Sequence, residues 1–423
     1  MSWMLLTGGG HVDFSSGLET IIHHARERKK KVLASLNGWY GIQEGGEFVV
    51  DISDYPIDNL RDIGGSFIGS SRTKPDIQRV AKNIKRYGVS ALIVFGGEDT
   101  LGVAKRLHGE FKVPVVGWPK TMDNDAAGNY ATVGYATAAH YAATGTSEAF
   151  RAAHTHSRIM LVPVFGRNYD WIAAAASDYG HADYIVPAER KDLDIGDVAR
   201  NIQETYENNR DKSTHPFAVV VVSEAAVEIK GLKHFIEKLL PAEKIKYDNF
   251  GHPKLEPEIL ALAMKDAISQ IGGIDYSDVG IKPLTYHMRD PNLIPIDEKF
   301  AVKTAEECVR LIDAGNFGQV ATIQDPDYSG KTPENPNLHI NANGKLLYVG
   351  NMSLEDATKI RPVKGTGYFD YGQLKPTNEL TKFLMPLLGE KKINPRDLLV
   401  PFKTAATVYA FSQQVDLSSP LIG

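Results

Sequence analysis

The sequence has few of the features that mark secreted, membrane and nucleic-acid-binding proteins. It contains one cysteine, Cys308, so no disulfide can form within the chain, which fits a reducing compartment. No apolar run approaches the roughly 20 residues of a membrane-spanning helix, and the opening MSWMLLTGGG lacks the layout of a signal peptide. Lysine and arginine (47) do not exceed aspartate and glutamate (52), and the net charge is −5. We therefore expect a cytoplasmic protein that binds neither membrane nor nucleic acid.

The composition is that of a globular protein large enough for more than one core. Hydrophobic residues make up 43% and charged residues 23% of the 423 residues, and both values are near globular averages. A chain of this length exceeds what a single hydrophobic core usually serves. Two domains, or one domain with elaborations, are therefore expected.

Short apolar runs alternate with amphipathic segments along the chain. The first third contains the runs MLL, VLASL, ALIVF and VPVVGW, which are separated by helical patterns such as IQRVAKNIKRYG. A second series of the same kind extends from RIMLVPVFG to PEILALAMKDAISQIGG. Strands separated by helices form parallel sheets that are covered on both faces. The sequence predicts an α/β protein with two doubly wound, Rossmann-like domains, mainly parallel central sheets and an active site in the cleft between them.

The change from one series to the other predicts the domain boundaries. We expect an N-terminal α/β domain over residues 1–143, completed by about residues 290–320, and a second α/β domain over residues 144–289. Residues 321–423 are expected to form a C-terminal extension that packs on this core. The sequence of the extension gives no indication of its function.

The segment GGEDT (96–100) follows the buried run ALIVF and precedes a helical pattern. Backbone N–H groups and the helix dipole favour anions at such a junction, and glycines let a phosphate approach closely. The alternative is a tight turn in which Asp99 caps the helix. Two acids beside a polyphosphate repel it unless a divalent cation lies between them, so the functional interpretation requires Mg²⁺.

The segment PKTMDND (119–125) places Lys120, Asp123 and Asp125 in one turn at the end of a strand. A lysine can hold a transferring phosphoryl group, one carboxylate can take a proton from an attacking hydroxyl, and the other can hold metal or orient the first. In isolation such a segment is more often a solvated turn. PKTMDND ends the strand that follows GGEDT in the sequence, and this position favours the functional interpretation.

With these turns, the chain resembles the phosphofructokinase family and, within it, the pyrophosphate-dependent branch. The similar motifs are GGG (8–10), GGSFIGSSR (64–72), GGEDT (96–100), PKTMDND (119–125), TVGYATA (132–138), RIMLVPVFGR (158–167), IVPAE (185–189) and TYHMR (285–289). They cover roughly the first 320 residues in the order and spacing of the family. The resemblance implies transfer of a phosphoryl group to the C1 hydroxyl of fructose 6-phosphate.

Two positions imply that the phosphoryl donor is pyrophosphate. In relatives that use ATP, glycines stand at the positions of Asp99 and Lys120. In the family, an aspartate at the first position intrudes where the α-phosphate of a nucleotide would lie, and a lysine at the second meets the pyrophosphate.

The resemblance also assigns roles on the donor side of the site. Asp123 would be the general base, and Asp125 and Glu98 would hold Mg²⁺. Lys120 and Arg72 would stabilise the transferring phosphoryl group, and Arg167 would help to hold both this group and the sugar. The further substrate-binding positions in this part of the chain are Gly9, Gly10, Gly97, Asp99 and Thr121.

On the sugar side, Arg158, Arg289 and Tyr286 would hold the 6-phosphate through charge-assisted hydrogen bonds. Phe165 and Gly166 stand where the family places residues along the sugar. In relatives the residue at the position of Arg158 comes from a neighbouring subunit, which implies a homodimer or a homotetramer.

The chain departs from the family pattern at four places. The first turn reads HVDFSSGLE, which is one residue longer and contains Asp13, and the metal-holding aspartate is replaced by Glu98. Asp170 occupies a position that is glycine in the family. The acid expected directly after the proline of IVP is replaced by Ala188, which leaves Glu189, one position later, as the candidate contact to sugar hydroxyls.

These departures leave alternatives open. Hydroxyl-reading contacts set sugar specificity, so the change at Ala188 makes another acceptor, such as sedoheptulose 7-phosphate, an alternative. A weakly catalytic paralogue that binds sugar phosphate in a regulatory role is an alternative of another class. Lipid and dinucleotide kinases that use ATP share a Gly-Gly-Asp-Gly-Thr turn, but they lack counterparts of PKTMDND and TYHMR.

Overall fold

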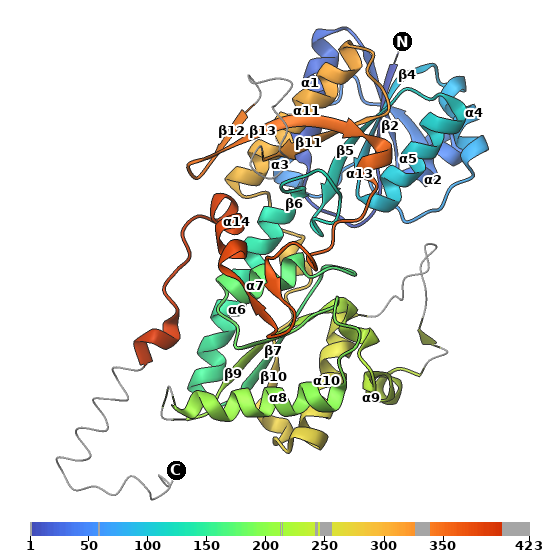
Figure 1. Ribbon diagram of the computed structural model, residues 1–423. Helices are drawn as coiled ribbons and strands as arrows, with labels where there is room; N and C mark the ends of the chain where they lie inside the picture. Colours follow the sequence, from blue (N-terminus) through green and yellow to red (C-terminus); the bar gives the residue numbers. More distant parts are fainter. Residues whose placement is uncertain are drawn as a thin grey trace, which may run out of the picture.

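The computed structural model describes residues 2–57, 60–211, 213, 215–241, 244–245, 256–325 and 339–399. These residues form two α/β units, each built around its own mainly parallel sheet, which lie one above the other in Figure 1. The predicted fold class is confirmed. Among the described residues, none of the helices combines the length and the apolar character needed to cross a membrane.

The first unit contains, within the described residues, a nine-stranded sheet of order β12-β13-β11-β5-β4-β1-β2-β3, with β6 paired to β5. Neighbours from β2 to β11 pair in parallel, whereas β3, β12 and β13 add antiparallel pairs at the two edges. The strands are β1 Ser2–Thr7, β2 Lys31–Ser35, β3 Val49–Asp51, β4 Val89–Gly96, β5 Val115–Thr121, β6 Val133–Gly134, β11 Gln319–Gln324, β12 His339–Ala342 and β13 Lys345–Ser353.

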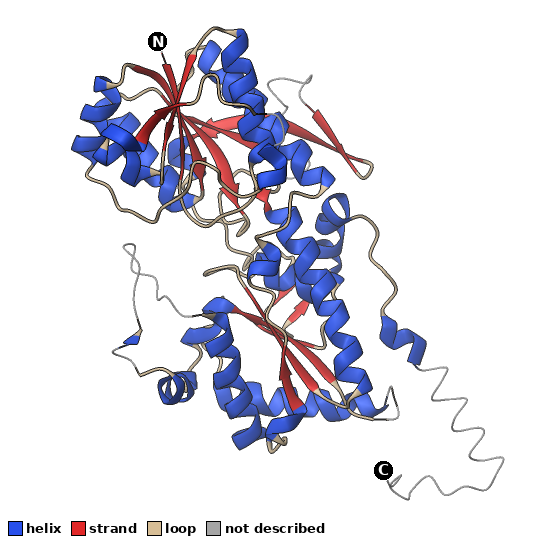
Figure 2. Cartoon of the chain, turned by 180° about the vertical axis from the view of Figure 1, so that it is seen from behind, coloured by secondary structure: helices blue, strands red, loops and turns tan. Residues whose placement is uncertain are grey.

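Helices cover both faces of this sheet, as the view from behind also shows (Figure 2). Side chains alternate along a strand, so Trp3 and Leu5 of β1 pack in one cluster with α1 and α11, while Met4 and Leu6 pack in another with α2, α4 and α5. The helices of this unit are α1 Ser15–Glu27, α2 Trp39–Glu44, α3 Leu60–Ile63, α4 Ile77–Arg86, α5 Glu98–Phe111, α11 Pro295–Asp313 and α13 Leu354–Ala357.

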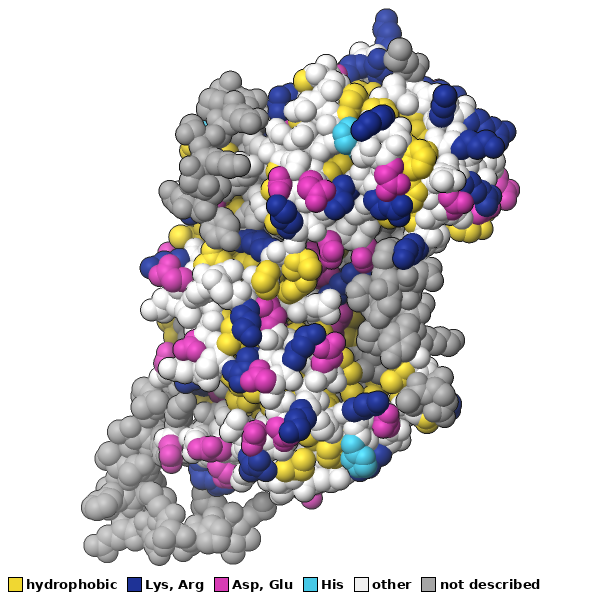
Figure 3. All heavy atoms as spheres, turned by 45° about the vertical axis from the view of Figure 1, so that its right-hand side comes forward, with side chains coloured by type: hydrophobic (Ala, Val, Ile, Leu, Met, Phe, Trp, Pro, Cys, Tyr) yellow, Lys and Arg dark blue, Asp and Glu magenta, His cyan; other side chains and the backbone are white. Residues whose placement is uncertain are grey.

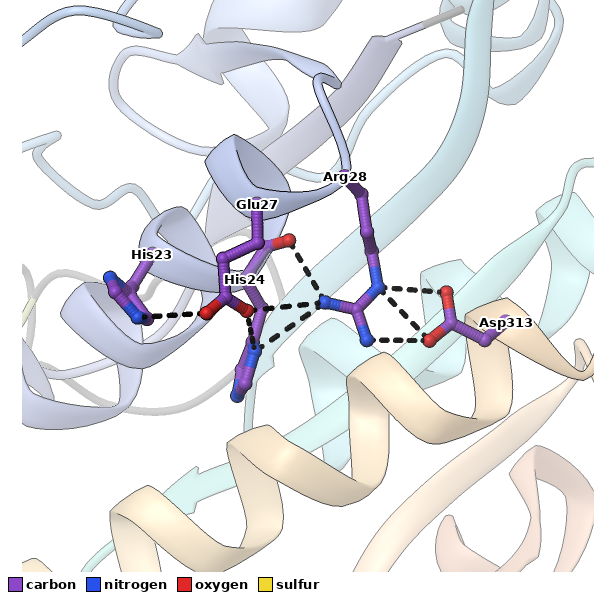
Figure 4. A network of polar contacts seen from close by, with 5 residues as sticks. All are labelled: His23, His24, Glu27, Arg28 and Asp313. Carbon is purple, nitrogen blue, oxygen red and sulfur yellow. Dashed lines mark hydrogen bonds and ion pairs between the residues drawn. The ribbon is translucent and has the colours of Figure 1, made fainter.

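Polar contacts join α1 to α11 at the rim of this unit (Figure 4). The Arg28 guanidinium donates to both carboxylate oxygens of Asp313, at 3.0 Å from Nε to Oδ1 and 2.8 Å from Nη2 to Oδ2. Glu27 contacts His23, His24 and Arg28 on the same side. The group links the N-terminal helix to a helix that follows the second unit in sequence.

The second unit contains an all-parallel sheet of order β10-β7-β9-β8. Its strands are β7 Ile159–Val164, β8 Tyr184–Val186, β9 Ala218–Ser223 and β10 Val279–Ile281. Val219 and Val221 face the cluster that contains α6 and α7, and Val220 and Val222 face the cluster that contains α8 and α10. The helices are α6 Tyr135–Thr155, α7 Trp171–Tyr179, α8 Ile195–Asn208, α9 Leu232–Leu239 and α10 Pro257–Gly272.

The C-terminal segment contacts both units. β13 belongs to the first sheet, and the chain then passes α13 and a short hairpin to reach α14, which packs against α6 and α7 of the second unit (Figure 1). The hairpin strands are β14 Phe369–Asp370 and β15 Lys375–Pro376, and α14 spans Asn378–Leu388. The domain boundaries proposed from the sequence stay a prediction.

The described residues form no large patch of positive or of negative charge on the face drawn in Figure 3. There, lysine and arginine side chains are interspersed with aspartate and glutamate. This distribution agrees with the charge balance of the whole chain.

Candidate active site

A cavity between the two units is lined by turns that follow strands of both sheets. Most of the lining comes from turns after β1, β4 and β5, and the second unit adds residues after β7 and β10. Of the predicted site residues, the cavity brings together Gly9, Gly10, Arg72, Gly97, Glu98, Asp99, Lys120, Thr121, Asp123, Asp125, Arg167 and Arg289. The turns after β1, β4 and β5 converge because the carboxyl ends of these parallel strands share one edge of the first sheet.

The acids of GGEDT occupy the first turn of α5. Gly97 precedes the helix, and no side chain caps it, so Asp99 does not act as the cap. The Asp99 carboxylate instead accepts a hydrogen bond from Arg167 Nη1 at 3.0 Å. A Cβ on Gly96 would lie 2.4 Å from Thr100 Cβ, so the turn requires glycine there for close packing.

The turn after β5 leaves two carboxylate oxygens without protein partners. Oδ1 of Asp123 and Oδ1 of Asp125 are buried and have no hydrogen-bond partner. Between them Asn124 adopts a left-handed backbone (φ 53°), and its Oδ1 accepts from the N–H of Thr132 at 3.0 Å. Burial raises the pKa of Asp125 to about 7, and the neighbouring charge of Asp123 adds to the rise. The turn thus presents two desolvated acids to the cavity.

Lys120 lies almost completely buried beside these acids, with 2% of its surface exposed. Its Nζ donates to the carbonyl oxygen of Gly10 at 2.6 Å. Burial and the nearby charge of Arg289 lower the pKa of Lys120 to about 7, and Asp123 opposes this shift. An incoming anion would favour the charged form of this amine.

Glu98 and Asp125, the predicted Mg²⁺ ligands, line the same cavity. Among the described residues, no three or more histidine, cysteine, aspartate or glutamate side chains lie together in a way that could hold a metal ion. Mg²⁺ is commonly bound by one or two carboxylates together with substrate phosphates and water. The unpartnered Asp125 Oδ1 and this pair of hard oxygen donors therefore fit a Mg²⁺ ion that is held jointly with phosphate.

Three of the predicted sugar-side residues form a cluster. The Arg289 guanidinium carbon lies 4.4 Å from the centre of the Phe165 ring, and the Tyr286 ring meets Phe165 edge-on at 5.7 Å. Gly166 follows with φ 154°, a backbone conformation that favours glycine, and leads directly to Arg167. A Cβ on Gly10 would lie 2.1 Å from Arg289 Nη1, so the arginine packs closely against the first turn.

The unusual first turn of the chain is tied to the sugar-side segment. His11 Nε2 lies 2.8 Å from Asp290 Oδ1, and its ring stacks on Tyr286 at 6.1 Å. Asp13 Oδ1 accepts from the backbone N–H of Ser15 at 3.0 Å, at the start of α1. His11 and Asp13 of this turn therefore make contacts within the protein.

The structure does not bring Arg158 into the cavity. Arg158 is exposed at the amino end of β7, whereas Phe165 and Arg167 follow its carboxyl end. The six residues of the strand separate these ends by about 20 Å. Arg158 therefore does not contact the cavity of its own chain.

Glu189 also lies outside the cavity lining, and its carboxylate contacts backbone groups. Its oxygens accept from the N–H groups of Asp170 (3.1 Å), Val363 (2.9 Å) and Lys364 (2.8 Å). Asp170 Oδ1 accepts from the N–H of Ala188 at 2.7 Å, so two of the departures from the family pattern are in direct contact. In this arrangement Glu189 binds the C-terminal segment.

Glu224 is a candidate that the sequence interpretation missed. It follows the carboxyl end of β9, and its Oε2 is buried without a hydrogen-bond partner. Burial raises its pKa to about 7, Asp123 adds to the rise, and a hydrogen bond from the N–H of Gly166 opposes it. The signal was present in VVVVSE, where an acid directly follows a buried strand, as in the other turns of the site.

Comparisons with known proteins show which proteins the chain is similar to. A family model described as "Phosphofructokinase" matches residues 4–256, more than half of the chain. The chain is 30% identical over 333 residues to a pyrophosphate–fructose 6-phosphate 1-phosphotransferase of Streptomyces coelicolor, covering 76% of this chain and 90% of the relative. It is 28% identical over 337 residues to ATP-dependent 6-phosphofructokinase 2 of the same organism, covering 77% and 91%.

A solved structure has a similar fold over most of the chain. The pyrophosphate-dependent phosphofructokinase from Nitrosospira multiformis superposes with a TM-score of 0.71 and 19% identity, covering 93% of each chain. This likeness extends the comparison beyond the residues that the family model matches.

Proposed function

The chain belongs to the phosphofructokinase family, and from this premise we propose that it transfers a phosphoryl group from pyrophosphate to the C1 hydroxyl of fructose 6-phosphate. The products are fructose 1,6-bisphosphate and phosphate, and the reaction is reversible and Mg²⁺-dependent. The observation that carries the proposal is that Asp99 and Lys120 line the same cavity as Asp123 and Asp125. The Oδ1 atoms of these two acids have no hydrogen-bond partner in the protein. Asp99 and Lys120 stand at positions that are glycine in relatives that use ATP.

Asp123 is the proposed general base. It takes the proton of the C1 hydroxyl as that oxygen attacks the terminal phosphorus of pyrophosphate, and the bond from phosphorus to the bridging oxygen breaks to release phosphate. Its buried Oδ1 has no competing partner in the protein. Lys120, Arg72 and Arg167 hold the phosphoryl oxygens by charge-assisted hydrogen bonds.

Glu98 and Asp125 are the proposed Mg²⁺ ligands. The ion would neutralise charge on the phosphate oxygens when bound. Glu98 lies in the first turn of α5, and Asp125 lies in the turn after β5.

The proposed sugar side consists of Arg289 and Tyr286 for the 6-phosphate, with Phe165 and Gly166 along the sugar. Arg158 completes it from a neighbouring subunit, so the active form is a homodimer or a homotetramer. The exposure of Arg158 at the far end of β7 supports this assignment. The cytoplasm is the proposed location.

Sedoheptulose 7-phosphate is the second candidate acceptor. It is favoured by the absence of an acid at Ala188 and by the engagement of Glu189 with the backbone of Val363 and Lys364. Glu224, whose buried Oε2 has no hydrogen-bond partner in the protein, is then the candidate acid to accept hydrogen bonds from sugar hydroxyls.

The function is tested by incubating the purified protein with Mg²⁺ and a panel of sugar phosphates, with pyrophosphate or ATP as donor. Phosphate release and bisphosphate formation are followed together. Turnover that requires pyrophosphate and fructose 6-phosphate is the expected result. Faster turnover with ATP would refute the assignment of Asp99 and Lys120, and binding of sugar phosphate without turnover would favour a regulatory paralogue.

A further inference from the structure

The loop that carries Asp123 and Asp125 is held from behind by the C-terminal segment. The backbone N–H of Arg361 donates to the carbonyl oxygen of Asp125 at 2.8 Å, and the N–H of Ala127 donates to the carbonyl oxygen of Lys359 at 3.1 Å. An isolated antiparallel bridge between residues 126 and 360 lies between these two contacts. The backbone of the loop is therefore engaged, while the Oδ1 atoms of its two acids are left without partners.

The side chain of Arg361 extends this support along the loop. Its Nη1 donates to the carbonyl oxygen of Asn129 at 2.5 Å and to that of Tyr130 at 3.1 Å. The N–H of Tyr130 in turn donates to the carbonyl oxygen of Ile323 in β11 at 2.5 Å. Arg361 is only 6% exposed, so these contacts form away from solvent screening.

The same residue reaches the other side of the site. The Arg361 guanidinium lies 4.3 Å from the centre of the Trp171 ring, and Trp171 Nε1 donates to the carbonyl oxygen of Arg361 at 2.8 Å. Trp171 is the first residue of α7, shortly after Arg167 in the turn that faces Asp99. One buried arginine thus joins the acid-bearing loop of the first unit to the helix that follows Arg167.

We propose that Arg361 is a positioning residue that fixes the acid-bearing loop relative to Arg167. The inference rests on the proposed function, because it concerns the same phosphoryl-transfer site. Arg361 touches no substrate: it acts through the backbone of residues 125–130 and through Trp171. It also gives the C-terminal segment a role in catalysis, since the chain beyond β13 supplies this contact. A misplacement of about 1 Å at such a site can lower the rate about 100-fold.

Arg396 provides a matched control. It is 5% exposed, lies in the same C-terminal segment, and its guanidinium carbon is 4.9 Å from the Phe150 ring centre. It pairs with Asp183, away from the cavity lining. Removal of either arginine should lower the thermal stability, but only Arg361 should affect the acid-bearing loop.

The experiment compares Arg361→Ala, Arg361→Lys and Arg396→Ala in the full chain. We expect Arg361→Ala to lower kcat about 10- to 100-fold with KM changed less than about threefold, and Arg396→Ala to keep kcat within about twofold. Millimolar ethylguanidine should restore part of the kcat of Arg361→Ala and leave that of Arg396→Ala unchanged. Arg361→Lys, which keeps a donor but loses the planar stack, should give an intermediate kcat and serves if the alanine variant fails to fold.

Amide hydrogen exchange separates this inference from the proposed function. The amides of Ala127 and Tyr130 should exchange faster in both Arg361 variants than in Arg396→Ala at equal global stability. If the wild type turns over no donor, the proposed function fails and the exchange comparison alone decides the inference. Equal exchange in the Arg361 and Arg396 variants, or an unchanged kcat in Arg361→Ala, would overturn it.

Discussion

Arg167 Nη1 donates a hydrogen bond to Asp99 Oδ2 over 3.0 Å, which joins the two turns that face each other across the cavity. Both side chains are about a quarter exposed (23% and 25%), so solvent screens the pair only in part. Asp99 therefore has two separable effects. In the proposed site its volume would occupy space beside the donor phosphates, and its charge holds Arg167 of the opposite unit.

Asp99→Asn separates these two effects. The amide keeps the volume, so we expect the preference for pyrophosphate over ATP to be retained. The weaker hydrogen bond to Arg167 should lower kcat/KM with pyrophosphate about tenfold. Steady-state rates with both donors check this, with Asp313→Asn, which weakens a remote pair with Arg28, as the control. Rates equal to the wild type would show that the ion pair has no role in turnover.

Binding of pyrophosphate should be accompanied by proton uptake at Lys120. The pKa of Lys120 is lowered to about 7 in the free protein, chiefly by burial, so at pH 8 most of this amine is neutral. A bound anion raises this pKa and the amine takes up a proton. Calorimetry at pH 8 in buffers of different ionisation enthalpy measures the uptake. It should be smaller in Lys120→Met and unchanged in Lys105→Met, a surface lysine paired with Glu355.

The fold and the convergence of turns on one cavity could be predicted because both depend on local sequence patterns. Alternating strand and helix periods define the two sheets, and turns such as GGEDT and PKTMDND directly follow buried strands, where parallel topology brings them together. The roles of the side chains in these turns come from the resemblance and stay a prediction.

The contacts that support the site could not be predicted, since they join segments far apart in the chain. Arg361 contacts Asp125, and His11 contacts Asp290, although the two partners of each pair lie far apart in the sequence. The engagement of Glu189 by the backbone of Val363 is of the same kind. No periodicity or motif of either partner specifies such a pair, because the contact depends on where the folded chain places the two segments.

The pair between His11 and Asp290 should couple the first turn to sugar binding. Its side chains are 38% and 63% exposed, so the coupling energy should be modest, about 0.2–1 kcal/mol. A double-mutant cycle of His11→Phe and Asp290→Ala, read out as KM for the sugar phosphate, measures it. Phenylalanine keeps the stack on Tyr286 and removes only the polar contact. Additive effects would show that the contact does not influence sugar binding.

Glu224→Gln should weaken sugar binding more than donor binding. The buried Oε2 has no partner in the protein and is suited to accept a hydrogen bond from a sugar hydroxyl. Loss of a charge-assisted hydrogen bond should raise KM for fructose 6-phosphate about 10-fold or more, with KM for pyrophosphate nearly unchanged. Glu228→Gln is the control, since Glu228 is half exposed and pairs with Lys191. A rise in both KM values would place Glu224 outside the sugar site.

Asp123→Asn and Asp125→Asn should affect turnover in different ways, because the two acids have different proposed roles. Asp123→Asn keeps the shape of the base and removes its ability to accept the proton, so kcat should fall about 10²- to 10⁴-fold at saturating Mg²⁺. Asp125→Asn removes a charged oxygen from the proposed Mg²⁺ site, so it should raise the Mg²⁺ concentration needed for half-maximal rate, and excess Mg²⁺ should recover part of the activity. Rates measured across a Mg²⁺ titration distinguish the two variants. Recovery of Asp123→Asn by Mg²⁺ would instead assign that residue to metal binding and leave the proton to another acceptor.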